Sequence, residues 1–210
     1  MTNLDLKIEV PICSPRPYEA RDFQEALPAP PPATVYGMLL SFCGIQGDEM
    51  GRFTGTEIGV ALSEEPEVSK VLRKMRRDPS AAGSNPDGEP QFRPEYQELR
   101  TGLTMWVKVV ESETSNETTL SDLLLQALRR PDSIERYGGV SLGESPFLVD
   151  SMTEVNGMPE DLLVLRPDDN GLYAMPVWTD YQDRKRTNLQ RFDLKEGVLR
   201  NRDTVVIEPG

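Results

Sequence analysis

Apolar and polar residues alternate strictly near the start of the chain. Residues 4–10 read LDLKIEV, in which every second residue is apolar and the residues between them are charged. Successive side chains of a strand point to opposite faces of a sheet, so this pattern predicts a strand with one buried face. The prolines at positions 11 and 15 are expected to end the strand.

A short apolar helix is predicted directly after a run of prolines at positions 30–32. These prolines fix φ near its helical value, and they lack the amide protons that a first helical turn leaves unbonded. The residues that follow carry an apolar stripe at helical spacing, formed by Val35, Met38, Leu39 and Phe42. We therefore expect a helix that packs on a sheet and stops at Gly44.

Alternating or short apolar runs predict further strands at residues 57–62, 101–110, 161–165, 172–178 and 204–207, and an apolar strand after the glycines of residues 137–143. A second helix is predicted over residues 119–130, with Thr119 as its N-cap, Asp122 three residues later and Pro131 as its terminator. Between residues 78 and 95, four prolines and two glycines predict a long irregular excursion.

The first two thirds of the chain thus follow the order strand, helix, strand, excursion, strand, helix, strand. This is the order of the split βαβ or ferredoxin-like fold, so we predict an α+β protein with a βαββαβ core, a long arm and additional C-terminal β strands. Many proteins that bind single-stranded RNA use this sheet. The fold alone assigns no function, because it carries many unrelated activities.

Composition narrows the class of protein. A chain of 210 residues suits one domain with an elaborated loop. The N-terminus is charged and no apolar run approaches ~20 residues, so we expect a cytoplasmic protein without a membrane segment. Cys13 and Cys43 have no partners at metal-ligand spacing and are expected to be buried free thiols.

Charge is segregated along the chain. The net charge of −12 argues against non-specific binding of nucleic acid by the whole surface. Residues 70–77 nevertheless carry five basic residues and no acidic one. This run fits either a solvated helix face or an arm that needs an anionic partner, such as RNA, to order it.

Two further segments suit RNA without being specific for it. Residues 137–147, YGGVSLGESPF, contain three glycines that would let a backbone pass close to a sugar-phosphate chain, although an ordinary loop before a strand explains them equally well. Residues 180–192, DYQDRKRTNLQRF, mix basic residues with Tyr181 and Phe192, as phosphate binding and base stacking require. A charged surface between strands is the alternative.

The chain contains no histidine. This removes serine–histidine and cysteine–histidine catalysis and most transition-metal sites, so we expect neither an enzyme nor a resident metal or cofactor. The glycines of residues 37–51 match neither GxGxxG nor GxxxxGK[ST], which argues against a nucleotide-binding loop. The paired acidic residues at positions 64–65 and 168–169 are read as solubilising charge in turns.

These features together resemble one family of proteins. The alternating first strand, the helix PPPATVYGMLLSFCG, the proline-broken arm and YGGVSLGESPF resemble the fifth-numbered family of CRISPR-associated (Cas) proteins, which are RAMP-superfamily subunits of the type I Cascade complex. The resemblance covers nearly the whole chain, and its length and acidity are most similar to compact variants of type I-B-like systems. It implies a single RAMP-like domain over residues 1–210, with a thumb at 63–100 and a C-terminal β extension at 160–210.

The resemblance implies that the protein binds the 5′ handle of the CRISPR RNA at one end of Cascade. The rigid helix start would then present free amides and the positive end of its dipole to a packed edge or an RNA phosphate. Combined with the basic and glycine-rich segments, the resemblance gives these candidate RNA-binding residues: Arg16, Arg21, Thr34, Tyr36, Lys70, Arg73, Lys74, Arg76, Arg77, Arg100, Gly138, Gly139, Gly143, Arg184, Lys185 and Arg186.

Three functions follow from this reading. The leading one is a non-catalytic subunit that caps the backbone and helps to dock the target-recognition subunit; its partners would be CRISPR RNA, the backbone and large subunits, and target DNA near the protospacer-adjacent motif. The second is a metal-independent endoribonuclease that processes precursor RNA, although lysine and tyrosine start about three units above neutral pH as proton carriers. The third is a protein-only adaptor whose basic arm binds an acidic partner.

Overall fold

The computed structural model describes residues 3–18, 25–76, 92–111, 118–180 and 186–210. The described residues form a nine-stranded antiparallel sheet and two α-helices. The strands are β1 (Asn3–Cys13), β2 (Glu57–Leu62), β3 (Glu67–Arg76), β4 (Phe92–Val110), β5 (Ser151–Glu154), β6 (Leu162–Pro167), β7 (Tyr173–Trp178), β8 (Asn188–Gly197) and β9 (Val205–Val206). The helices are α1 (Pro32–Phe42) and α2 (Leu120–Arg129), and short 3-10 helices span Gly47–Phe53, Pro131–Ser133 and Asn201–Asp203.

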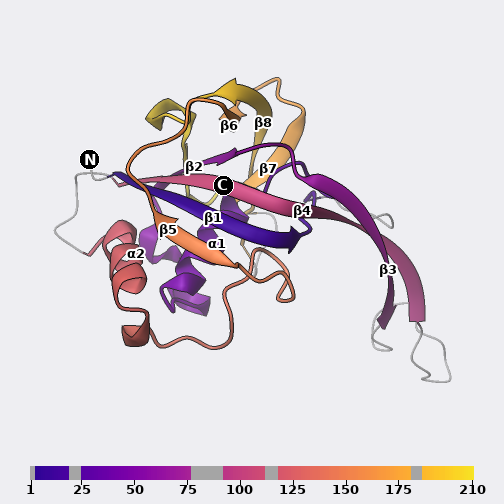
Figure 1. Ribbon diagram of the computed structural model, residues 1–210, viewed down its shortest axis with the longest axis horizontal. Helices are drawn as coiled ribbons and strands as arrows, with labels where there is room; N and C mark the ends of the chain where they lie inside the picture. Colours follow the sequence, from indigo (N-terminus) through magenta and orange to yellow (C-terminus); the bar gives the residue numbers. More distant parts are fainter. Residues whose placement is uncertain (1–2, 19–24, 77–91, 112–117, 181–185) are drawn as a thin grey trace.

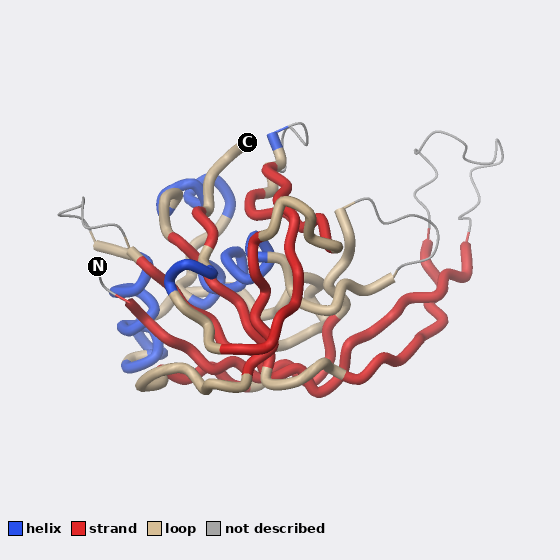
Figure 2. The backbone as a smooth tube through the Cα atoms, turned by 90° about the horizontal axis from the view of Figure 1, so that it is seen from above, coloured by secondary structure: helices blue, strands red, loops and turns tan. Residues whose placement is uncertain are grey.

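The central sheet has the strand order β5-β1-β4-β2-β6-β8-β7, with β3 added to β4 and β9 added to β2. Both α-helices lie on one face of the central strands (Figures 1 and 2). The α+β class expected from the sequence is therefore confirmed. No helix in the described part of the chain is long and apolar enough to cross a membrane.

The core sits between the helices and the face of the sheet that the sequence pattern predicted. The alternating residues Leu4, Leu6, Ile8 and Val10 of β1 are at most 3% exposed, and every second residue of β4 from Leu103 to Val109 is at most 2% exposed. Val35, Met38 and Leu39 of α1 are buried against them, while Phe42 is half-buried. The strand and helix periodicities thus identified the buried faces correctly.

The helix boundaries follow the expected signals. Pro31 is the N-cap of α1 and Pro32 its first residue, and the helix ends two residues before Gly44. Gly44 has φ +77°, and a Cβ at this position would lie 2.4 Å from the carbonyl oxygen of Glu135. Only glycine fits both the left-handed backbone and this close approach.

A capping box starts α2. The hydroxyl of Thr119 accepts a hydrogen bond from the Asp122 amide, and the Asp122 carboxylate accepts one from the Thr119 amide. We expect Thr119→Ala to lower the free energy of unfolding by about 1 kcal/mol, because it orphans a donor of the first turn. Urea unfolding measures this loss. Thr118, the adjacent exposed residue, provides the control. If Thr118→Ala lowered the free energy of unfolding by the same amount, the capping role of Thr119 would be contradicted.

The largest difference from the sequence reading concerns the basic segment. Residues 67–76 form β3, not a helix face, and they pair with β4 from Phe92 to Thr101. β4 therefore begins nine residues before the predicted strand at 101–110 and includes Pro94. Among the described strands, only β3 pairs with residues 92–99 of β4, so Pro94 lies where one edge of β4 has no neighbouring strand, a position at which a missing amide is tolerated.

Together, β3 and the first part of β4 (Phe92–Thr101) form a two-stranded ribbon, here called the arm. It leaves the body where β4 passes from pairing with β3 to pairing with β1 and β2 (Figure 1). Gly102, at this junction, has φ +70° and lets the strand change direction there. Residues 92–95 of the predicted irregular excursion therefore belong to β4, and its other residues, 78–91, lie outside the described residues.

Two strands near the C-terminal half also differ from the prediction. β8 was not predicted as a strand, and the sequence left residues 180–192 as either an RNA-binding segment or a charged surface between strands. Only one of the ten residues of β8, Phe192, is buried, so its alternation signal is weak. The strand expected directly after the glycines begins later, at Ser151, because Phe147 and Val149 belong to a turn and an isolated bridge region. β8 completes the sheet between β6 and β7.

The two cysteines are free thiols, as expected. Cys13 is buried and Cys43 is half-buried. Burial raises the pKa of each thiol to about 12. Both are therefore protonated and unreactive near neutral pH.

Candidate nucleic-acid interface

Four polar side chains from four separate segments meet at the base of the arm. Arg16 follows β1, Arg73 lies on β3, Gln97 lies on β4, and Glu144 belongs to the glycine-rich loop, residues 137–147. We call these four residues the clasp. Arg16 Nη2 donates to Glu144 Oε1, and Arg73 Nη1 donates to Glu144 Oε2 at 2.7 Å. Gln97 Nε2 also donates to Glu144 Oε1, at 2.8 Å, and Gln97 Oε1 accepts from Arg73 Nη1 at 2.6 Å.

The fold places these groups together through register and turn geometry. Gln97 is paired with Val71, so Arg73 and Gln97 are diagonal neighbours on one face of the arm. Gly143, with φ +81°, precedes Glu144 and lets the loop turn, and the Glu144 carbonyl accepts a hydrogen bond from the Phe147 amide. Gln97 is only 1% exposed, so its amide must be satisfied within the protein, and the clasp satisfies it.

The clasp keeps Glu144 ionised. Burial opposes the charged form, but the Arg73 hydrogen bond, the positive charge of Arg16 and the Gln97 hydrogen bond together outweigh it, so the pKa of Glu144 is lowered from its ordinary value of 4.5. The Glu144 side chain is 25% exposed and that of Arg73 is 29% exposed. The carboxylate therefore ties the glycine-rich loop to the arm and to the segment after β1 by charge-assisted hydrogen bonds.

A pocket of about 390 Å³ adjoins the clasp. Its lining comes from the segment after β1, the start of α1 and the glycine-rich loop, and consists of Ser14, Pro15, Arg16, Pro30, Thr34, Leu142, Gly143 and Glu144. Three residues that were predicted to contact RNA, Arg16, Thr34 and Gly143, thus line one cavity, although they come from segments that are distant in the sequence. With Arg73 in the clasp beside it, they form the only group of predicted residues that the described structure brings into one site.

The start of α1 offers less to an anion than the sequence analysis expected. Pro31 and Pro32 have no amide hydrogen, and the amides of Thr34 and Val35 both donate to the Pro31 carbonyl, at 2.9 and 3.1 Å. Of the first helical residues, only Ala33 keeps an amide without an assigned partner in the described structure. The proline run therefore orients α1, and the expectation of several free amides at its start is corrected.

Two other predicted residues lie in the interior. Tyr36 is 2% exposed, and its hydroxyl donates to the Met50 carbonyl at 2.7 Å; burial raises its pKa to about 12. Arg100 is 8% exposed and donates to the carbonyls of Ala26 and Leu27 at 2.9 and 3.1 Å. Both side chains hold neighbouring segments in place and neither is presented on the surface of the described chain.

The remaining predicted residues are spread over the molecule. Gly138 has φ +78°, and Gly139 packs close to Leu148, so both shape the far part of the glycine-rich loop. Arg186 is exposed and its carbonyl accepts a hydrogen bond from the Gly210 amide.

Of the predicted basic residues of the arm, the structure describes the backbone of Lys74 and Arg76 at the outer end of β3. The other predicted residues lie outside the described part: Arg21, Arg77, Arg184 and Lys185.

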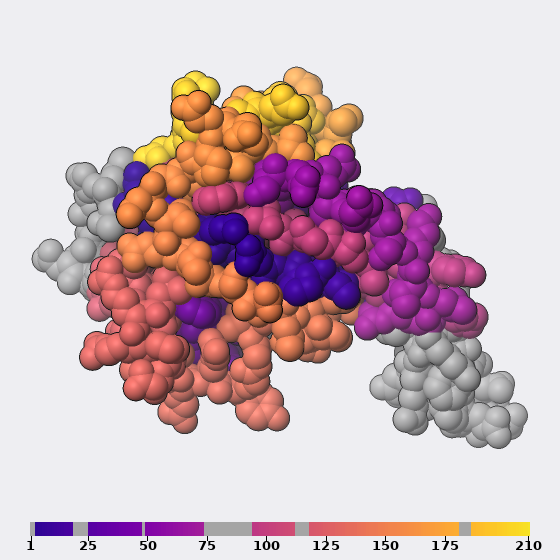
Figure 3. Space-filling model, viewed as in Figure 1, coloured from indigo at the N-terminus to yellow at the C-terminus, as the bar shows by residue number. Residues whose placement is uncertain are grey.

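The arm presents a mixed apolar and basic face. Directly paired residues of adjacent strands point to the same face, so Leu72 and Tyr96, which are paired, share a face with Val68 and Lys70. The three apolar residues are 50–58% exposed. On the same face, Lys70 Nζ lies 3.4 Å from Glu98 Oε1. Figure 3 shows the arm projecting from the body.

Sequence reasoning missed four residues of the arm and the glycine-rich loop. Glu144 and Gln97 were not assigned because their roles depend on the contacts of the folded clasp, and Tyr96 fell between the predicted irregular segment at 78–95 and the predicted strand at 101–110. Tyr137, 95% exposed beside Gly138, stood within the quoted YGGVSLGESPF segment without a role. The sequence feature that could have identified Tyr137 is its place as an aromatic residue next to a pair of glycines, because an exposed aromatic ring can stack on a base.

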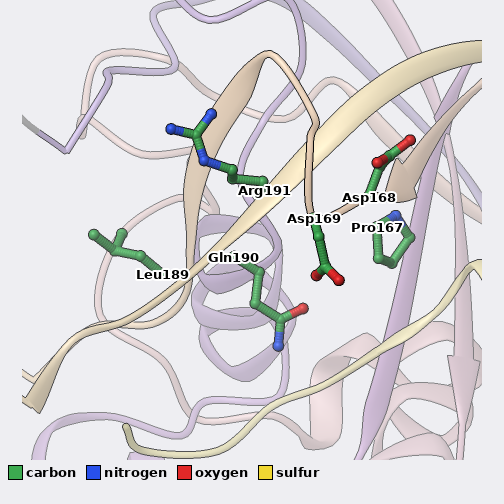
Figure 4. A pocket seen from close by; sticks show the side chains of 6 residues that line it. All are labelled: Pro167, Asp168, Asp169, Leu189, Gln190 and Arg191. Atoms are coloured by element: carbon green, nitrogen blue, oxygen red, sulfur yellow. The ribbon is translucent and has the colours of Figure 1, made fainter.

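A second and larger pocket, of about 510 Å³, lies on the C-terminal part of the sheet. It is lined by Pro167, Asp168, Asp169, Leu189, Gln190 and Arg191 (Figure 4). Two of its charged groups are engaged within the chain: the Asp168 carboxylate accepts a hydrogen bond from Lys195 Nζ at 2.8 Å, and Arg191 Nη1 donates to the Gly171 carbonyl at 2.9 Å. Figure 4 shows the side chains of Asp169 and Arg191 pointing away from each other.

Metal-binding chemistry has no evident place in the described residues. They contain no group of three or more acidic, cysteine or histidine residues arranged to hold a metal ion. The site defined by the arm, the clasp and the smaller pocket combines cations, amides and apolar walls with one carboxylate, Glu144, which Arg16 and Arg73 neutralise. Such a surface suits a polyanion with exposed flat groups better than a small metal-dependent substrate.

The geometry is that of an α+β protein with a basic β-ribbon arm, and comparisons with known proteins place it in a family. No model of a known protein family matches the chain. The CRISPR-associated protein Cas5 of Myxococcus xanthus (strain DK1622) is 31% identical over 196 residues, which are 91% of this chain and 89% of that protein. The chain therefore belongs to the Cas5 family of CRISPR-associated proteins, as the sequence resemblance indicated.

Solved structures support the same fold. A chain of a structure described as "CRISPR RNA-guided surveillance complex" superimposes with a TM-score of 0.64 at 14% identity, over 96% of this chain and 95% of that one. A second, described as "Crystal structure of Cas protein", gives a TM-score of 0.53 at 16% identity over the full length of both chains. At these identities the likeness concerns the fold.

Proposed function

We propose that the protein is a non-catalytic Cascade subunit that binds the 5′ handle of a CRISPR RNA. The observation that carries the proposal is the convergence of Arg16, Thr34, Arg73 and Gly143 at the base of a basic arm. Membership in the Cas5 family and the fold likeness to a chain of an RNA-guided surveillance complex support it. Base pairing by the RNA would then read the target sequence, as in other guided systems.

We further assign the core to the ferredoxin-like fold and the arm to the thumb of a RAMP-like domain. The strand order β5-β1-β4-β2, with α1 after β1 and α2 after β4, supports this assignment, because it corresponds to the order 4-1-3-2 of a βαββαβ sheet. In this assignment β3 is an addition to the third core strand. The strands from β6 to β9 form the C-terminal extension, which widens the sheet beyond β2.

A non-catalytic role is favoured by the chemistry of the side chains. The chain has no histidine, and Tyr36, two residues after the pocket residue Thr34, has its pKa raised to about 12 by burial. General acid–base catalysis needs a group that titrates near the working pH. An endoribonuclease remains the second candidate, and specific cutting of a repeat transcript by the purified protein would favour it over the proposed role.

The direct test is to co-express the tagged chain with its genomic neighbours and a repeat–spacer array and to sequence the RNA that co-purifies. We expect a single repeat-derived 5′ end, lost together with the intact assembly when this subunit is omitted. Heterogeneous RNA, or none, in an intact protein assembly would contradict handle binding. Nuclease treatment then identifies a protein-only adaptor, because its complex would survive the loss of RNA unchanged.

A further inference from the structure

The pocket beside the clasp combines walls of two kinds. Pro15, Pro30 and Leu142 supply apolar surface, while Arg16 and Thr34 supply polar groups at the same cavity. Its volume of about 390 Å³ lies within the range of ~300–1,000 Å³ that is typical of ligand pockets. A cavity of this size accommodates one flat ring system with a sugar, and it is too small for a folded peptide element.

Arg16 has hydrogen-bonding capacity that the described protein does not use. Its guanidinium group carries five N–H donors, of which Nη2 is bonded to Glu144. Within the described part of the chain, Arg16 Nε is buried and has no hydrogen-bond partner. The Arg16 side chain as a whole is 36% exposed and lines the cavity, so its guanidinium group can donate to a ligand there while Glu144 holds Nη2.

Glu144 fixes the direction of this guanidinium group. Its carboxylate is itself held by Arg73 and Gln97, which belong to the arm, so Arg16 is oriented by the same contacts that join the arm to the body. Gly143 and Thr34 lie opposite each other at the cavity: a Cβ on Gly143, whose φ is +81°, would be 3.7 Å from Thr34 Cγ2. The absence of a side chain at position 143 keeps this space open.

The chemistry of the lining selects the occupant. A free anion would leave the proline and leucine surfaces without a partner, and an aliphatic ligand would leave the arginine donors unsatisfied. A nucleobase satisfies both, because its faces pack against apolar walls and a guanidinium plane and its edge accepts hydrogen bonds. Arg73 of the arm meets Glu144 beside the cavity, so a strand of RNA held at the base of the arm would deliver a base to the pocket.

We propose that this pocket holds one nucleobase of the bound RNA, turned out of the strand, with Arg16 as the hydrogen-bond donor to its edge and Glu144 as the positioning residue for Arg16. This inference rests on the proposed function, since it requires that RNA follows the arm. Turning a base out of a single strand costs less than extracting it from a duplex, so packing and one charge-assisted hydrogen bond suffice to hold it.

An abasic scan tests the proposal on the full chain. The probe is a set of synthetic RNAs with the repeat-derived 5′ sequence, each lacking the base at one position, and binding is measured by fluorescence anisotropy. For the unmodified protein we expect one position at which loss of the base weakens binding about tenfold, as expected for one base packed and hydrogen-bonded in a pocket. Uniform sensitivity of less than twofold at every position would overturn the pocket assignment.

Two variants connect that position to the pocket. Thr34→Phe fills the cavity, and Arg16→Lys keeps the positive charge but removes the planar group with its fixed donors. Each is expected to weaken binding of intact RNA about tenfold and to abolish the extra effect of the missing base. If the variants and the missing base act additively, the base lies elsewhere and the proposal is wrong.

Two control variants show whether a weaker binding of RNA comes from loss of the pocket or from a general effect of the same substitution elsewhere. Thr153→Phe adds the same side chain on an exposed position of β5, and Arg129→Lys makes the same exchange on the exposed surface of α2; both should leave the scan unchanged. Thermal unfolding checks that Thr34→Phe folds, and Arg16→Lys carries the test if it does not. Failure of the unmodified protein to bind any repeat RNA would overturn the proposed function as well, whereas binding without a pocket-dependent base would overturn this inference alone.

Discussion

Replacing Lys74, Arg76 and Arg77 by alanine is expected to weaken RNA binding roughly 10–100-fold at about 0.15 M salt and to flatten its salt dependence. The backbone of Lys74 and Arg76 lies at the outer end of β3, away from the clasp, and Arg77 is the next residue in the sequence. Each phosphate neutralised on a single strand contributes about 0.7 to the slope of log K against log salt concentration. The triple variant should therefore reduce the slope by about 2.

Arg73 is deliberately left intact in this variant. It bonds to Gln97 and Glu144, so its removal would disturb the base of the arm as well as its charge. The control removes three exposed cations elsewhere, Arg129, Arg130 and Arg202, and so changes the net charge by the same amount. A slope that falls equally in both triple variants would mean that overall charge, and not the arm, governs binding.

Glu144→Gln is expected to lower the free energy of unfolding by about 2–3 kcal/mol at pH 7. The carboxylate accepts hydrogen bonds from Arg16, Arg73 and Gln97, and a neutral amide weakens the two charge-assisted bonds and leaves both guanidinium groups without their counter-charge. Urea unfolding at fixed salt measures the loss. Glu160→Gln, at an exposed position before β6, removes one charge without this network and should change stability by less than 0.5 kcal/mol.

The pH dependence gives this prediction a second readout. Because the folded state lowers the pKa of Glu144 below its ordinary value of 4.5, the stabilisation is complete above the pKa of the unfolded chain and is lost as the pH falls through the lower, folded-state value. The difference between the unmodified protein and Glu144→Gln should therefore be constant from pH 6 to 8 and should shrink below pH 4.5. A difference that stays constant into acid would show that the ionised carboxylate is not its source.

The elements that were predicted correctly share one property: their signals are local. Alternation in residues 4–10 and 101–110 identified strands whose apolar faces are buried, and the proline run and Thr119 marked the two helix starts. Burial of a face and satisfaction of helix-end groups leave traces within a few residues. The segments that were misread lacked such traces. β8 buries one residue, and β3 has a basic sequence that fits a helix face equally well.

The candidate site shows the same division. The sequence by itself determined that positive charge is concentrated near the arm, that no histidine is present for catalysis, and that the chain resembles one protein family. Only the tertiary structure decided which candidates share a site. It joined Arg16, Thr34, Arg73 and Gly143, and it buried Tyr36 and Arg100 in structural roles.

The physical reason is the separation of these residues along the chain. Arg16 and Glu144 are 128 residues apart, and Arg73 and Glu144 are 71 apart. Their contact depends on the register of β3 with β4 and on a left-handed glycine in a loop, and neither the register nor the loop's position on the sheet is encoded by local periodicity. Residue types and their local spacing therefore determined the elements and the charge, whereas the pairing of distant strands decided the clasp and the pocket.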